Sequence, residues 1–233
     1  MFSAVLTVLA RAARLTGVPF GRRMPARPVV FLACALWLSP ASAALDGTAA
    51  DLEAYLAGVQ TLSARFHQTV IDERGNPVEQ AEGDLLLLRP GRFRWDYSRP
   101  YVQQIVSNGE VLWMYDQDLE QVTVHTARQA LRSTPAELLS GNRPLTESFA
   151  LTNLGQRDGQ DWVLLQPTAA DTGYSEVRVG LRDGALSGME LKDALGQLTR
   201  LSFSAVQRNI AVDPAQFEFE PPAGVEVVDN RQQ

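Results

Sequence analysis

The feature that most constrains this chain is a long succession of short, strand-like segments separated by turn signals. Between residues 63 and 207, apolar and polar side chains alternate with a period of two, which is typical of a half-buried strand. Gly, Pro, Asn and Asp recur between the segments, and Asn108 followed by Gly109 is a hairpin signal. Ten or so short, mostly antiparallel strands predict a mainly β fold, either an incomplete barrel or a strongly curved sheet.

Helical signals interrupt the strands at two places. Near the start, Thr48 and Asp51 resemble a capping box, and apolar residues follow at helical spacing over residues 52–59. In the middle, the stretch "STPAELLSG" has Thr134 as the N-cap, a proline in the first turn and a glycine stop, and residues 127–131 favour another short turn. Helices so placed predict a lid over one mouth or one face of an open antiparallel barrel.

The first 43 residues have the pattern of a signal peptide. Arg22, Arg23 and Arg27 lie just before a ten-residue apolar run at residues 29–38, and alanines occupy the small-residue positions of a cleavage site. The run is shorter than the about 20 residues that a membrane span needs. We therefore expect export and removal of residues 1–43, with Met24 as an alternative start of translation. Residues 44–233 would form a single domain.

The charge of the remaining chain excludes two classes of partner. The five arginines of residues 1–43 leave with the signal peptide, so that 16 basic and 27 acidic residues remain, a net charge of −11 with His neutral. Such a chain is unsuited to nucleic acids and to anionic lipid surfaces. The only cysteine, Cys34, lies in the apolar run, where Phe31 disfavours a lipidation motif. We expect neither a lipid anchor nor a disulfide.

No residue group has the pattern of a catalytic or metal centre. His67 and His125 are far apart in sequence and lack a helix-spaced partner, so each is expected on a strand, facing solvent. Asp116, Asp118 and Glu120 lie in a predicted hairpin turn, where aspartate is favoured for its turn chemistry. The sequence has no nucleophile elbow and no phosphate-binding glycine loop. It therefore nominates no enzyme, no cofactor and no metal.

Aromatic side chains gather on neighbouring predicted strands. We expect most of them to share one face of the sheet and to line an apolar cavity: Phe93, Trp95, Tyr97, Trp113 and Tyr115. For any single ring, ordinary core packing is the simpler interpretation, so the prediction of a cavity depends on the group. The helices would cover this face with the residues of the predicted lid: Leu52, Tyr55, Leu56, Leu131, Leu138 and Leu139.

Arg89 is a charged residue at the end of the most apolar predicted strand, between "LLLL" and Pro90. A guanidinium that points inward needs acceptors, and the carbonyls at the end of a covering helix would serve. Arg89 would then be a latch between barrel and lid. A charge that protects a strand edge from aggregation is an equally good interpretation of the spacing alone.

Several of these stretches resemble one protein family. "GDLLLLRPGRFRWDYSRP", "QQIVSNGEVLWMYDQDLEQVTV", "STPAELL" and the closing "FEFEPPAGVEVVD" are similar to the LolA family, the periplasmic carriers of outer-membrane lipoproteins. The resemblance implies an incomplete antiparallel barrel, a helical lid and an apolar cavity for acyl chains. It also implies that Arg89 holds the lid closed, that Phe93 lies at the cavity mouth and that Trp95 belongs to the barrel.

The resemblance predicts a periplasmic chaperone that takes lipoproteins from the inner-membrane transporter LolCDE and passes them to the outer-membrane receptor LolB. We expect a monomer without a cofactor. A periplasmic sensor of lipids or lipoproteins, with a related fold, is the alternative, although 190 residues leave no room for a signalling domain. An esterase acting on lipids or glycans is the enzymatic alternative.

Overall fold

The structure, a computed structural model, describes residues 47–130, 135–141, 143–169 and 173–231. The predicted signal peptide, Cys34, Leu131 of the predicted lid and the predicted N-cap Thr134 lie outside these residues. None of the helices in the described ranges is long and apolar enough to cross a membrane.

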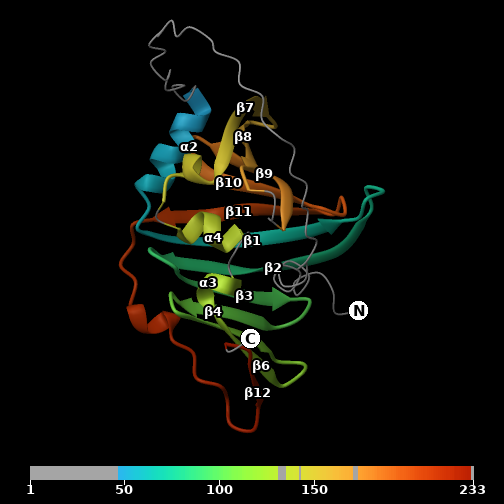
Figure 1. Ribbon diagram of the computed structural model, residues 1–233, viewed down its shortest axis with the longest axis vertical. Coiled ribbons are helices and arrows are strands. Elements are labelled where there is room, and N and C mark those ends of the chain that lie inside the picture. Colours follow the sequence, from blue (N-terminus) through green and yellow to red (C-terminus); the bar gives the residue numbers. More distant parts are fainter. Residues whose placement is uncertain (1–46, 131–134, 142, 170–172, 232–233) are drawn as a thin grey trace, which may run out of the picture.

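The strands form where the period-two pattern predicts them. They are β1 (Thr61–Ile71), β2 (Pro77–Leu88), β3 (Arg92–Arg99), β4 (Gln103–Asn108), β5 (Val111–Asp116), β6 (Gln121–Thr126), β7 (Phe149–Arg157), β8 (Gln160–Pro167), β9 (Tyr174–Arg182), β10 (Ala185–Asp193), β11 (Leu198–Arg208) and β12 (Glu226–Asp229). Figure 1 shows them as one sheet, and its described strands run in the order β12-β6-β5-β4-β3-β2-β1-β11-β10-β9-β8-β7.

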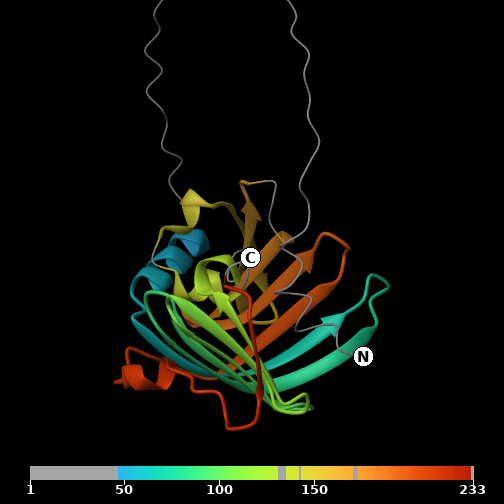
Figure 2. The same cartoon turned by 60° about the horizontal axis from the view of Figure 1, so that its bottom comes forward.

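The mainly β prediction is confirmed, with one pairing that the sequence did not reveal. Consecutive strands pair antiparallel within β1–β6 and within β7–β11, and β1 joins these two halves by pairing antiparallel with β11. The exception is β12, a strand that was not predicted, which pairs in parallel with β6. The described sheet does not close, because its end strands β7 and β12 do not pair with each other. In Figure 2 the sheet curves around the helices.

The helices lie against the concave side of this sheet (Figure 2). They are α2 (Gly47–Ala57), α3 (Ala127–Ala130), α4 (Pro135–Ser140) and the 3₁₀ turn η2 (Leu145–Glu147). Helix α2 contacts β7 and β8, α3 contacts β5 and β6, and α4 contacts β3. The helix predictions near residues 52 and 135 are confirmed, but Thr48 lies inside α2 and does not cap it. We call the helix-bearing side of the sheet the inner face.

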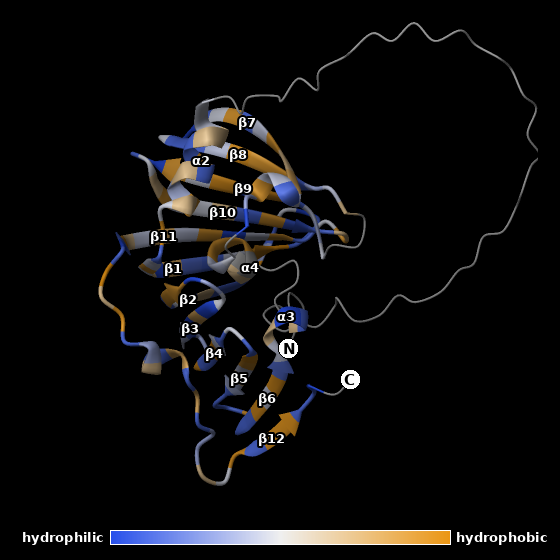
Figure 3. Cartoon of the chain, turned by 60° about the vertical axis from the view of Figure 1, so that its left-hand side comes forward, coloured by the Kyte–Doolittle hydropathy of each residue, from blue (hydrophilic) through white to orange (hydrophobic). Residues whose placement is uncertain are grey.

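Alternation along the strands separates the inner face from the outer face. In β2, for example, Ala81, Leu85 and Leu87 are buried while residues between them are more exposed. Orange and blue segments alternate in the same way along the strands in Figure 3. The inner-face residues form one hydrophobic cluster with the buried residues of all three α-helices. Burial of this cluster is the main stabilising contribution to the fold.

The C-terminal segment covers part of the outer face. The 3₁₀ turn η3 (Pro214–Phe217) is capped by the Asp213 side chain and contacts β3 and β4. Its Phe217 is completely buried, at 0% exposure, and Val106 of β4 is buried to the same extent on that side. The first half of the sheet therefore has apolar packing on both faces.

Candidate functional site

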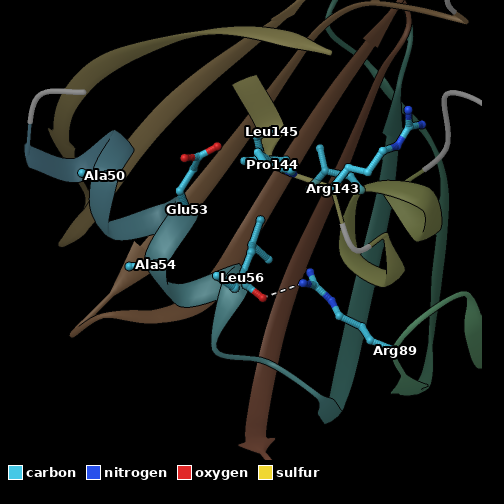
Figure 4. A pocket seen from close by; sticks show the side chains of 10 residues that line it. Ala50, Glu53, Ala54, Leu56, Arg89, Arg143, Pro144 and Leu145 are labelled. Carbon is cyan, nitrogen blue, oxygen red and sulfur yellow. Dashed lines mark hydrogen bonds between the residues drawn. The ribbon is translucent and has the colours of Figure 1, made fainter. Parts of the chain in front are cut away.

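Arg89 connects the sheet to two helices. Its Nε donates to the carbonyl oxygen of Leu139 in α4 at 2.8 Å, and its Nη1 donates to the carbonyl oxygen of Leu56 in α2 at 2.5 Å. Figure 4 shows the guanidinium reaching toward Leu56 from the end of β2. The backbone N–H of Arg89 also donates to the carbonyl oxygen of Gln60, just after α2, at 2.8 Å. One side chain thus joins three segments that are distant in sequence.

The chemistry of this contact follows from the helix ends. The last carbonyls of a helix have no partner within the helix, and they carry the negative end of its dipole. Neither α2 nor α4 has a basic residue in its last turn. Arg89 supplies from the sheet the cation that both helices lack. A guanidinium suits this position because it is planar and has several donors that can serve two carbonyls at once.

Burial around Arg89 favours the pairing. Desolvation by burial lowers the pKa of the Arg89 guanidinium, and the Tyr55 hydroxyl opposes this effect. A guanidinium stays charged at physiological pH in spite of such a shift, so it keeps its donors. Because the Arg89 charge is partly removed from water, its hydrogen bonds are stronger than they would be on an open surface.

A second set of contacts around Arg89 was missed by the sequence reasoning. The backbone N–H of Gly91 donates to the carbonyl oxygen of Ser140, at the end of α4, at 3.0 Å. The hydroxyl of Ser107, which is fully buried, donates to the Gly91 carbonyl at 3.1 Å and accepts from the Gly109 N–H at 3.2 Å. Gly91 has a φ of +73°, a conformation that favours glycine. The Pro-Gly turn signal was visible in the sequence, but its contact with α4 was not.

The three aromatic residues of β3 lie on the inner face as predicted from their spacing. Phe93, Trp95 and Tyr97 are 2%, 5% and 8% exposed. Phe66 of β1, which was not predicted for the site, lies edge-on to both Trp95 and Tyr97, with ring centroids 5.2 and 5.0 Å apart. The Tyr97 hydroxyl donates to Gln68 Oε1 at 3.2 Å, so its polar end is satisfied within the apolar cluster.

The placement of Trp113 and Tyr115 on the same face was wrong. Trp95 pairs with Ile105, and Ile105 pairs with Met114, so Met114 is the β5 residue that shares the inner face. Because successive residues of a strand face opposite ways, Trp113 and Tyr115 lie on the outer face. Tyr115 there contacts the ring of Phe219, at a centroid distance of 5.7 Å.

The residues predicted for the lid lie on α2 and α4, apart from Leu131, which is outside the described residues. All five are buried, and they belong to the same cluster as the β3 rings: Leu52, Tyr55, Leu56, Leu138 and Leu139. The helices thus rest on the inner face chiefly through apolar side chains. The described polar contacts of α2 and α4 with the sheet are concentrated around the turn that carries Arg89 and Gly91.

A pocket of about 430 Å³ opens beside the Arg89 guanidinium (Figure 4). Its volume is within the range of small-molecule sites, roughly 300–1,000 Å³. The lining residues come from α2, α4, the end of β2 and the approach to η2: Ala50, Glu53, Ala54, Leu56, Ala57, Arg89, Leu138, Arg143, Pro144 and Leu145. The space between the two helices is therefore incompletely filled next to the Arg89 contact.

The described residues contain no group of three or more His, Asp or Glu side chains placed to hold a metal ion. The site is an apolar surface covered by helices, and a few hydrogen bonds hold these helices in place. Such a surface can exchange one set of apolar contacts for another.

Comparisons with known proteins show which family the chain belongs to. A family profile described as outer membrane lipoprotein carrier protein LolA matches residues 57–220. An outer-membrane lipoprotein carrier protein of Methylococcus capsulatus is 46% identical over 180 residues, which are 77% of this chain and 86% of that protein. One from Methylobacillus flagellatus is 43% identical over 189 residues, 81% of this chain and 92% of that protein.

A solved structure resembles the fold at low sequence identity. An uncharacterized conserved protein from Thermus thermophilus has a TM-score of 0.50 and 14% identity, and the match covers 78% of this chain and 96% of that one. This likeness concerns the fold alone. By the profile and by the two carrier proteins, the chain belongs to the LolA family of outer membrane lipoprotein carrier proteins.

Proposed function

We propose that this protein carries lipoproteins through the periplasm by holding their acyl chains between the inner face of the sheet and helices α2 and α4. The observation that carries the proposal is the double hydrogen bond of Arg89 to the ends of both helices. In this proposal α2 and α4 are the lid, Arg89 is its latch and Phe93 lies at the mouth of the cavity. Trp95 and Tyr97 are part of the cavity wall.

The physical task is to shield acyl chains from water without holding them too tightly. Each methylene removed from water is worth about 0.8 kcal/mol, so a sixteen-carbon chain represents roughly 12 kcal/mol before losses. In the closed form the helix leucines and the β3 rings already bury one another. Cargo must replace these contacts, so its net affinity is the difference between two burials. That difference is small enough for release.

Transport in one direction then requires no chemical reaction at this protein. The family is one of carriers, not of enzymes. The protein accepts cargo from the inner-membrane transporter LolCDE, and a receptor with a better-fitting cavity, LolB, takes it over. Residues 1–43 would direct export and be removed, and residues 44–233 would act as a single, monomeric carrier domain. Met24 is an alternative translation start within the leader.

The proposal is tested by following cargo on Arg89→Leu. Without the latch, helix contacts compete less with the acyl chains, so the variant should retain a loaded lipoprotein longer when receptor is added. Arg94→Leu is the matched control, because Arg94 is on the outer face of β3 and pairs with Asp96 at 2.6 Å. Delivery by Arg89→Leu at the rate of the unmodified protein would contradict the latch.

Loading is tested separately on Phe93→Glu. A carboxylate on the inner face would meet acyl chains, so this variant should bind a fluorescent triacylated lipopeptide much more weakly. Ser204→Glu, at an exposed position of β11, is the control and should bind normally. If the unmodified protein binds no lipopeptide at all, the carrier function itself is wrong.

A further inference from the structure

The exposed large apolar residues are concentrated at one end of the strands. Within the described ranges these residues are Val78, Tyr101, Val102, Leu119, Leu154, Leu195 and Val227. All except Leu154 lie in, or within two residues of, the turns before β2, β4, β6 and β11 or at the start of β12. Arg89 follows the last residue of β2, so it lies at the opposite end of the sheet. Single exposed apolar residues are normal, whereas a concentration of them marks an interaction site.

Four of these residues lie on neighbouring segments that backbone hydrogen bonds join, and we call them the hairpin patch: Tyr101, Val102, Leu119 and Val227. They are 62%, 42%, 51% and 49% exposed. The turn after β5 is bonded to the turn after β3, because the Gln117 N–H donates to the Val102 carbonyl at 3.3 Å. The Glu226 N–H donates to the Glu120 carbonyl at 3.0 Å, which places β12 beside the same turn. Figure 2 shows these hairpin turns converging near β12.

The hairpin patch has a strongly acidic border. Carboxylates flank it at the turn after β5 and at the start of β12: Asp116, Asp118, Glu120 and Glu226. Arg99, the last residue of β3, is the basic residue next to the turn that carries Tyr101, and it forms an ion pair with Glu82 on β2. The surface therefore combines apolar side chains with an excess of negative charge.

We propose that the hairpin patch docks a protein whose contact face has Lys and Arg side chains around an apolar depression. The charge argues for this occupant: an anionic lipid surface would be repelled, and a second copy related by two-fold symmetry would bring the same carboxylates together. A basic protein face is complementary to both the apolar and the acidic part. The proposal depends on the carrier function, since the partners are the proteins that the carrier meets when it loads or delivers cargo.

Docking at this end has a mechanical consequence. The hairpin patch and the Arg89 contact are at opposite ends of the strands, as Figure 1 shows for the turns on the right and the start of β3 on the left. A partner held at the hairpin patch leaves the ends of α2 and α4 uncovered. Binding of the partner and opening of the helices can therefore proceed without steric conflict.

The experiment measures the affinity of the exported protein for two purified probes, the soluble domain of the receptor and the periplasmic domain of the transporter. The double variant Tyr101→Ser/Leu119→Ser should weaken binding to at least one probe by about tenfold or more. Asp118→Lys should slow association with the same probe and reduce the dependence of its rate on salt. Unchanged melting temperatures would show that the variants are folded.

Matched controls lie on the other half of the same end. Leu195→Ser removes a residue of similar exposure, 60%, and Glu73→Lys reverses a charge on the turn between β1 and β2. Both should bind the probes like the unmodified protein. Equal loss in patch and control variants, or no loss in any variant, would overturn the assignment.

Two further measurements separate the alternatives. Sedimentation that shows a dimer abolished by Tyr101→Ser/Leu119→Ser would overturn the proposal in favour of self-association. Binding to phosphatidylglycerol vesicles that the same variant loses would overturn it in favour of a membrane surface. Triacylated lipopeptide binding should be unchanged in the patch variants. If the unmodified protein binds lipopeptide but the patch variants bind both probes normally, only this inference fails and the carrier function stands.

Discussion

The two faces of the first half of the sheet are covered in different ways. On the outer face, the cover is the C-terminal segment, whose strand β12 is bonded along β6 and whose Phe217 is completely buried. On the inner face, the cover is α2 and α4, which rest on apolar side chains and on the hydrogen bonds around Arg89 and Gly91. A backbone ladder resists displacement, whereas apolar contacts can be exchanged for those of a guest molecule. The inner cover is therefore the one suited to open.

The largest expected difference between the faces concerns two glycines. A Cβ on Gly83 of the inner face would lie 1.9 Å from the Asp96 carbonyl oxygen, so Gly83→Ala should separate β2 from β3 and cost at least about 5 kcal/mol of unfolding free energy. A Cβ on Gly188, on the outer face of β10, would lie 3.1 Å from the Trp162 ring, so a side chain and not a backbone atom would have to give way, and by less. Gly188→Ala should cost only about 1–3 kcal/mol. Urea denaturation followed by circular dichroism measures both; similar losses would contradict the assignment.

Two tryptophans test the comparison next. Trp95→Ala empties a buried inner-face site and should lower the free energy of unfolding by about 3–5 kcal/mol. Trp113→Ala acts on the half-buried outer face and should lower it by about 1 kcal/mol. Only Trp95→Ala should also alter lipopeptide binding. A lipopeptide-binding defect in Trp113→Ala would show that Trp113 lines the cavity, contrary to its position on the outer face.

The outer face of the second half depends on a buried carboxylate. Glu190 is 3% exposed, and it accepts from Arg157 at 3.1 Å, from Arg200 at 3.1 Å and from Arg178 at 3.4 Å. Glu190→Gln removes the negative charge that these three arginines share, so it should cost about 1–3 kcal/mol in chemical denaturation. Glu82→Gln breaks the more exposed pair with Arg99 and should cost less than about 1 kcal/mol. Equal costs would show that Glu190 is not the centre of the network.

The smallest expected effect is a dependence on pH at the sheet edge. His125 was predicted to face solvent. It lies instead half-buried on the inner face of β6. Burial lowers the pKa of His125 below its ordinary value of 6.5, and the Asp229 carboxylate opposes the shift. Between the lowered pKa of His125 in the folded protein and its ordinary value in the unfolded chain, the unfolded chain binds more protons than the folded chain does. The free energy of unfolding should therefore decrease as the pH falls through 6.5.

The control for this pH effect is His67, which is exposed on β1. His125→Gln should flatten the pH dependence of the urea midpoint between pH 7.5 and pH 5.5, and His67→Gln should leave it in place. A midpoint that rises on acidification, or a dependence that survives His125→Gln, would contradict the assignment.

The sequence predicted which segments are strands better than it predicted which residues face each other. Period-two alternation divides each strand into two faces, and this suffices for Phe93, Trp95 and Tyr97. It does not decide which face of β5 continues that of β3, because register is set by hydrogen-bonded partners. Trp113 and Tyr115 were misplaced for this reason.

Other parts of the site depend on contacts between distant segments. Strand β12 is four residues long and pairs in parallel with β6, about 100 residues earlier in sequence, so no hairpin signal marks it. The position of Arg89 suggested either an inward contact with a helix end or a guard at a strand edge. Only the folded chain places Leu56 and Leu139 within reach of the guanidinium.

The proposed carrier function depends on Arg89 keeping α2 and α4 closed over the inner face in competition with acyl chains. Hydrogen exchange of the amides of α2 and α4 tests it most directly, compared among the unmodified protein, Arg89→Leu and Arg94→Leu without cargo. We expect Arg89→Leu to exchange as fast in these helices as the unmodified protein does with bound triacylated lipopeptide, while Arg94→Leu stays protected. Equal protection of α2 and α4 in all three cargo-free proteins would contradict it.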